Sequence, residues 1–142
     1  MSYIKICFAV ICGVIATFFG QYGLIIGLVA AAIVFDFVTG IIKGKINGNI
    51  NSQKGWVGFW KKLALLVGLF FGIFLDYFIP LLLANELISV TMPFKLPFGL
   101  VVGCYIILNE GISVIENLID CGMRFPPFIL KMFKTAKKQM TK

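Results

Sequence analysis

The stretch from Ile6 to Phe35 contains no charged residue, and this apolar run constrains the fold more than any other feature of the chain. A helix that crosses the hydrocarbon of a bilayer needs about 20 such residues, so the run is too long for one span and short for two. Gly20-Gln21-Tyr22-Gly23 offers a break within it. We therefore expect a short first segment over residues 4–19 and a fuller span over residues 24–42. Whether the first segment crosses the membrane or lies in its interface stays open.

Two later apolar runs predict further spans over residues 63–83 and 98–117. Of the 142 residues, 60% are hydrophobic and 13% are charged, which is far from the composition of a soluble domain. We expect a single all-α, polytopic membrane domain over residues 1–142 with three to four transmembrane helices. Residues 43–62 predict a loop followed by an interfacial stretch, where Trp56 and Trp60 fit the aromatic belt. Residues 84–97 predict a short exposed connection.

The C-terminal residues 128–142 combine apolar side chains on one helical arc with lysines on the other, which predicts a basic amphipathic helix in the membrane interface. The formal net charge of +7 favours contact with anionic lipids. Nucleic acid is a poor alternative partner, because the basic residues adjoin apolar spans. With four crossings, all but Lys95 of the thirteen basic residues lie on one face. A model with three crossings also places residues 43–62 and the C-terminus on the same side of the membrane. The positive-inside rule therefore predicts a cytoplasmic C-terminus.

A polar stripe occupies the second half of the last predicted span. With 100° between helical residues, Asn109, Ser113, Glu116 and Asp120 share one narrow face, with Glu110 and Asn117 at its edge. Polar groups at membrane depth are costly unless they face protein or water, so this stripe is the candidate functional site. It could line a pore, join subunits or bond neighbouring helices within one monomer.

Asp36 is an ionisable residue inside the second predicted span. A lone ionised aspartate at membrane depth costs about 3 kcal/mol, so a basic partner is expected. Lys43, Lys61 and Lys62 are the candidates. Asp36 could serve as a structural ion pair, or it could line a polar path or determine how helices pair.

Small residues at a spacing of four predict close helix packing in lipid, although such pairs also arise by chance in a glycine-rich chain. The pairs are Gly23 with Gly27, Gly68 with Gly72, and Gly99 with Gly103. The four cysteines have neither a metal-ligand nor a disulfide spacing, and the chain has no histidine. Because no nucleophile adjoins a base and no loop could cradle phosphate, we expect no enzyme, cofactor or metal site.

Three blocks of residues, taken in order, resemble the toxin-secretion and phage-lysis holin family, of the phage holin family 4 type. The first is Asp36-Phe37-Val38-Thr39-Gly40. The second is Asn51-Ser52 with Gly55, Gly58 and Lys61-Lys62, and the third is the stretch 109–117. The resemblance covers about residues 34–127. It marks as signature positions Asp36, Thr39, Gly40, Gly55, Lys61, Lys62, Asn109, Glu110, Gly111, Ser113, Glu116 and Asn117.

The resemblance implies a small protein of the bacterial cytoplasmic membrane that forms homo-oligomers. Such a protein opens a pore or lesion through which an endolysin or a toxin passes as cargo. Two alternatives remain from the residues: a selective ion or small-solute channel, and a non-conducting regulator of the antiholin type.

Overall fold

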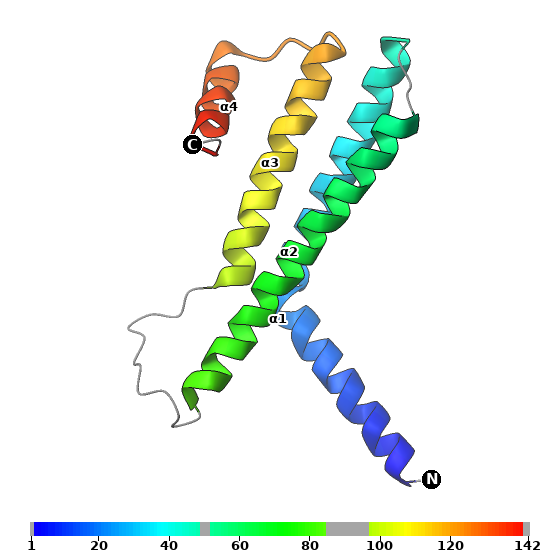
Figure 1. Ribbon diagram of the computed structural model, residues 1–142, viewed down its shortest axis with the longest axis vertical. Helices are drawn as coiled ribbons and strands as arrows, with labels where there is room; N and C mark the ends of the chain where they lie inside the picture. The colour runs from blue at the N-terminus through cyan, green and yellow to red at the C-terminus, as the bar shows by residue number, and fades with distance from the viewer. Residues whose placement is uncertain (1, 49–51, 85–96, 141–142) are drawn as a thin grey trace.

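A computed structural model describes residues 2–48, 52–84 and 97–140, which form four α-helices (Figure 1). These are α1 (Ser2–Ile46), α2 (Ser52–Ala84), α3 (Phe98–Asp120) and α4 (Pro127–Met140). Three segments are long and apolar enough to cross a membrane: Gly20–Ile46, Gly55–Leu83 and Phe98–Asp120. The expected all-α, polytopic membrane architecture is confirmed, with three candidate spans.

The helix α1 continues through Gly20–Gly23, so the break predicted there, between residues 4–19 and 24–42, is wrong. In Figure 1, α1 changes direction where its dark blue N-terminal part meets the lighter blue part. Glycines permit such a bend, whereas the chain here has no proline to interrupt the backbone hydrogen bonds. A helix in lipid keeps those bonds, because no water can replace them.

The polar segment over residues 43–62 is also more helical than expected. The helix α1 extends to Ile46 and α2 begins at Ser52. The lysines of this segment therefore lie within the two helices. Gly48 ends the first of these helices with a φ of 64°, a conformation that glycine adopts without strain. The connection predicted over residues 84–97 lies outside the described residues, apart from its two ends.

Six buried side chains form the core where the three spans meet. The helix α1 contributes Tyr22, Ile25 and Val29, while Leu69 and Ile73 come from α2 and Ile106 comes from α3. Large apolar side chains also cover the outside of the bundle, among them Leu24, Phe71 and Val101. An apolar exterior around a small core is the arrangement expected of helices surrounded by lipid.

Three of the predicted packing glycines lie where helices approach most closely. A Cβ atom on Gly72 would lie 3.3 Å from the Cα atom of Gly99, so α2 and α3 approach at this pair. A Cβ atom on Gly103 would collide with the side chain of Ile25 on α1. The absence of side chains at these points lets the backbones come together.

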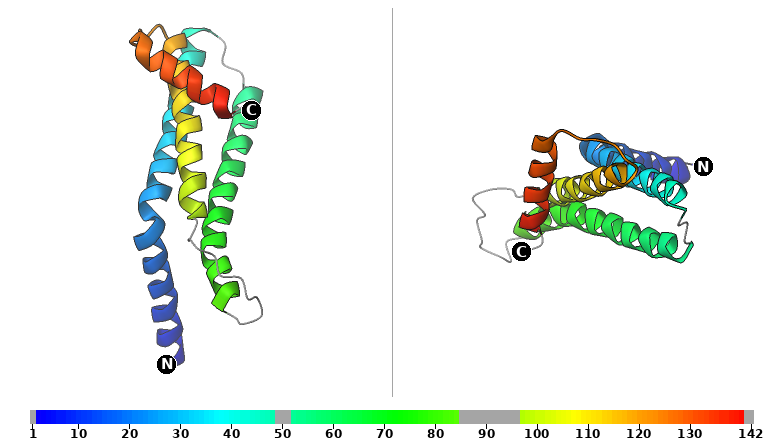
Figure 2. Two further views of the ribbon diagram at one scale, coloured as in Figure 1. Left: turned by 90° about the vertical axis from the view of Figure 1, so that its left-hand side faces the viewer. Right: turned by 90° about the horizontal axis from the view of Figure 1, so that it is seen from above.

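The helix α3 ends in a Schellman motif that turns the chain toward α4. Gly122, with a φ of 91°, donates its N–H to the Ile119 carbonyl at 2.8 Å, and Met123 donates to the Leu118 carbonyl at 3.0 Å. The helix α4 then lies on the side of α3 away from α1, as Figures 1 and 2 show.

Candidate functional site

The three spans contribute one charged side chain each to an ion cluster between them. Lys62 of α2 places its Nζ atom 2.6 Å from Oδ2 of Asp36 on α1, and the same atom contacts Oε2 of Glu110 on α3. The exposed fractions of the three side chains are 14%, 16% and 5%, respectively. One ammonium group therefore joins all three helices in a largely buried setting.

Hydrogen bonds extend this cluster along α1 and α3. The Nδ2 atom of Asn117 donates to Oδ1 of Asp36 at 2.9 Å and to Oγ1 of Thr39 at 3.3 Å. Thr39 in turn donates to the Phe35 carbonyl at 2.8 Å. A Cβ atom on Gly40 would lie 3.7 Å from the Asn117 amide, which is an ordinary van der Waals contact. The carboxylate of Asp36 is thus bonded through both of its oxygens.

The charges of the cluster do not cancel when all three groups are ionised, because two carboxylates face one ammonium group. Asn109 adds a donor to Oε1 of Glu110 at 3.4 Å, which is a weak contact. Separating a buried ion pair is more costly than its net contribution to stability suggests, because it leaves a charge without a partner in a medium of low dielectric. Removal of the Lys62 ammonium group would therefore leave two largely buried carboxylates without their shared cation.

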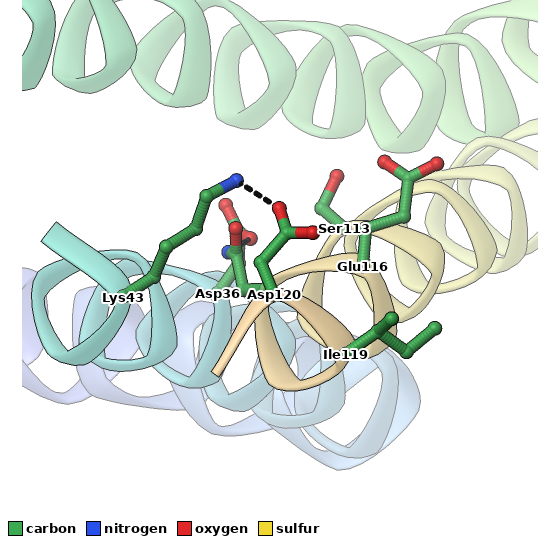
Figure 3. Close-up of a pocket in the computed structure, with 7 residues that line it drawn as sticks. Asp36, Lys43, Ser113, Glu116, Ile119 and Asp120 are labelled. Atoms are coloured by element: carbon green, nitrogen blue, oxygen red, sulfur yellow. Dashed lines mark hydrogen bonds and ion pairs between the residues drawn. The ribbon is translucent and has the colours of Figure 1, made fainter. Parts of the chain in front are cut away.

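An open cleft of about 490 Å³ adjoins the cluster at the same end of the bundle (Figure 3). Lys43 and Asp120 form an ion pair of 2.6 Å at this cleft, between the C-terminal ends of α1 and α3. Both side chains are substantially exposed, so the pair contributes little to stability. The residues that line the cleft are Asp36, Lys43, Ser113, Glu116, Asn117, Ile119 and Asp120.

A second polar junction lies toward the opposite end of the bundle, around Asp76 of α2. Its carboxylate accepts the backbone N–H groups of Phe98 at 2.6 Å and Gly99 at 2.8 Å, and so caps the N-terminus of α3. Tyr22 of α1 donates its hydroxyl to the same carboxylate at 3.1 Å. The three spans are therefore joined by polar contacts at two levels with an apolar core between them.

The structure separates the residues of the predicted polar stripe. Glu110 and Asn117, which the helical geometry placed at its edge, make the contacts with α1 and α2 described above. Ser113 donates to the carbonyl of Asn109 on its own helix at 3.3 Å, and Glu116 is exposed at the cleft. The buried acid of the stripe is therefore Glu110.

Among the lysines proposed to pair with Asp36, the structure selects Lys62. Lys61 is exposed, and Lys43 pairs with Asp120. The predicted packing glycines fall into two groups. Cβ atoms on Gly27 and Gly68 would meet no atom within 4 Å, whereas Cβ atoms on the other group would meet a neighbouring helix. That group comprises Gly72, Gly99 and Gly103. Gly23 is partly buried.

The junction at Asp76 and Tyr22 was not assigned from sequence. The available signal was a charged residue inside an apolar run. However, Asp76 and the start of α3, which it caps, are far apart in the sequence. Among the described residues, no group of three or more histidine, cysteine, aspartate or glutamate side chains could hold a metal ion.

The fold and the site define a polytopic α-helical membrane protein that gathers ionisable side chains between its spans. A comparison with models of protein families matches the bacteriophage holin family over residues 13–138, so the chain belongs to this family. The resemblance noted from the three sequence blocks is confirmed. Comparisons with curated proteins and with solved structures give no match.

Proposed function

We propose that this protein oligomerises in the bacterial cytoplasmic membrane and opens a lesion that releases an endolysin or a toxin, without enzymatic activity of its own. Its membership of the holin family supports this proposal. The observation that carries it is the ion cluster of Asp36, Lys62 and Glu110, which is enclosed by helices with apolar outer surfaces. The outer surface of such a monomer is compatible with lipid, whereas its ion cluster and the adjoining cleft are compatible with water.

In this proposal, the polar stripe of α3 forms the surface of the lesion that faces water. The stripe comprises Asn109, Glu110, Ser113, Glu116, Asn117 and Asp120, and part of it already borders the open cleft. Copies of the chain would associate through small-residue surfaces that the monomer leaves open, such as the one at Gly27. The lysines of α4 would lie against anionic lipid on the cytoplasmic side.

Inducible expression in bacteria, with and without a co-expressed endolysin, tests the proposal. We expect loss of membrane potential in both cultures, and lysis with release of cell contents where the endolysin is present. The control is the same vector with a stop codon early in the reading frame. Cells that stay polarised and retain the enzyme while the protein accumulates in their membranes would exclude the holin function.

A cation-selective channel is a second candidate, because Asp36, Glu116 and Asp120 line the cleft at one end of the bundle. Such a channel would pass ions without passing folded proteins. Release of a folded reporter enzyme from the cytoplasm would therefore exclude the channel. A delay of lysis on co-expression with an independent holin would instead indicate a regulator of the antiholin type.

A further inference from the structure

The N-terminal part of α2, residues 52–64, is here called the α2 arm, and its large side chains are mostly exposed. Leu65 and Leu66, which follow the arm, are partly buried against the core. Trp56, Phe59 and Trp60 pack on one another, with ring centroids 5.6 to 5.8 Å apart. All three rings belong to the same helix. Their contacts stiffen the arm but do not attach it to α1 or α3.

The rest of α2 is attached much more firmly. Leu69 and Ile73 are fully enclosed in the core, and Gly72 lies against the backbone of α3 at Gly99. Asp76 adds hydrogen bonds to the first residues of α3. The helix α2 therefore has one end fixed in the bundle and another whose large side chains mostly face outward.

The cleft lies between α1 and α3, on the side that faces the α2 arm. Every residue that lines it belongs to α1 or α3, and Figure 3 shows the α2 ribbon passing across the open side. The helices α1 and α3 are joined there by Asn117 with Asp36 and by Lys43 with Asp120. Lys62 makes two ion pairs that tie the arm to this pair of helices, one with Asp36 and one with Glu110.

Gly68 lies between the arm and the enclosed part of α2. A Cβ atom on it would meet no atom within 4 Å, so close packing does not explain a glycine here. A glycine inside a helix lowers helical stability by about 1 kcal/mol relative to alanine. The position is therefore suited to bending between a fixed and a movable part.

We propose that Lys62 is a latch that holds the α2 arm against Asp36 and Glu110, and that its release lets the arm pivot near Gly68. Release uncovers the cleft between α1 and α3 and brings water to both carboxylates and to the rest of the polar stripe. As a step of lesion opening, this regulation rests on the proposed function, but the movement itself can be measured without any lysis.

Distances between spin labels in lipid nanodiscs test the latch. The four native cysteines would be replaced by alanine, and labels would be attached after Val57→Cys on the arm and Leu108→Cys on α3, both exposed positions. A reference pair, Phe35→Cys with Leu108→Cys, reports on α1 and α3. Labelled chains would be diluted with unlabelled chains to suppress distances between copies.

We expect Lys62→Gln to add a population of longer distances between residues 57 and 108, with the reference distance unchanged. The matched control Lys61→Gln changes an exposed neighbouring lysine and should leave both distances as in the parent chain. Lys62→Arg retains the cation and should keep the arm closed. An unchanged distribution in Lys62→Gln, or an equal change in Lys61→Gln, overturns the latch.

If Lys62→Gln fails to fold, Glu110→Gln and Asp120→Asn provide the decisive pair. The first removes one partner of the latch and leaves Asp36 with Lys62, so it should open a fraction of the arms. The second weakens the exposed ion pair of Asp120 with Lys43, which joins α3 to α1, and should leave the arm closed. Equal distances in these two variants overturn the latch, whereas the absence of lysis in cells would overturn the proposed function and leave the distance result unaffected.

Discussion

The glycines of α2 and α3 differ in what a single methyl group would meet. On Gly99, a Cβ atom would lie 2.6 Å from Cγ1 of Ile73 and 2.9 Å from Oδ2 of Asp76, as well as 3.2 Å from the Cα atom of Ile73. Backbone and a bonded carboxylate cannot move aside easily. At Gly68, the same atom would occupy open space.

This difference predicts opposite effects of alanine. Gly99→Ala should lower the free energy of unfolding by about 1–3 kcal/mol, because it forces α2 and α3 apart. Gly68→Ala should raise it by up to about 1 kcal/mol, because alanine favours the helix. Equilibrium unfolding in mixed detergent micelles would measure both. A comparable loss of stability in the two variants would contradict the close approach at Gly99.

Asp76 provides a second test at the residue scale. Asp76→Ala removes the acceptor of two backbone N–H groups at the start of α3 and should cost about 1–2 kcal/mol of unfolding free energy. Tyr77→Phe is a neighbouring control, since the Tyr77 hydroxyl makes an exposed 3.3 Å hydrogen bond to Gln21. The same unfolding measurement should show little change for Tyr77→Phe. Equal losses in both would argue against the capping role.

Helical periodicity predicted the polar stripe of α3, but it did not predict which members would be buried. An angle of 100° per residue places side chains on a face, whereas the rotation of that face toward its neighbours depends on where helices approach. Here the approach points are Gly99 and Gly103, and they turn Glu110 and Asn117 inward. The same rotation leaves Glu116 at the cleft, so the contacts of the site required the tertiary structure.

At the scale of elements, α1 is longer than any bilayer requires. Its 45 residues extend about 68 Å at 1.5 Å per residue if straight, compared with about 30 Å of hydrocarbon. The sequence indicated excess apolar length, but it also predicted a break at the glycines, through which α1 continues. It could not distinguish a bend from a helix end, because both use glycine and only the direction of the following chain separates them.

The continuous course of α1 predicts that its N-terminal end lies outside the cytoplasm when the C-terminus lies inside. In a chain without native cysteines, Tyr3→Cys should react with a membrane-impermeant maleimide in intact cells. Thr135→Cys on α4, also an exposed position, should react only after permeabilisation. Protection of residue 3 in intact cells would instead favour four crossings with both termini inside.

At the scale of the whole molecule, the closed bundle separates two kinds of small-residue surface. Gly72, Gly99 and Gly103 are used within the monomer, while Gly27 faces outward beside the exposed side chains of Leu24 and Leu28. The same role was predicted for all of these glycines, because a spacing of four residues does not distinguish a contact within the monomer from a contact between copies. The internal and the external glycines therefore require different experiments.

If copies associate through the face at Gly27, Gly27→Leu should reduce chemical cross-linking to dimers and larger species and should delay lysis. The monomer should keep its helical content and unfolding free energy, because the new side chain meets open space. Gly103→Leu is the contrasting variant and should destabilise the monomer itself. Unchanged cross-linking in Gly27→Leu, with normal expression, would show that oligomers use another surface.

The bend in α1 has a mechanical consequence for the membrane. The N-terminal part of the helix is apolar and about 18 residues long, so it would occupy a strip about 27 Å long and about 10 Å wide if it lay within one leaflet. Each copy would then expand one monolayer relative to the other. Every copy would therefore stress the membrane in the same direction. This elastic stress would increase with expression level, even before any two copies come into contact.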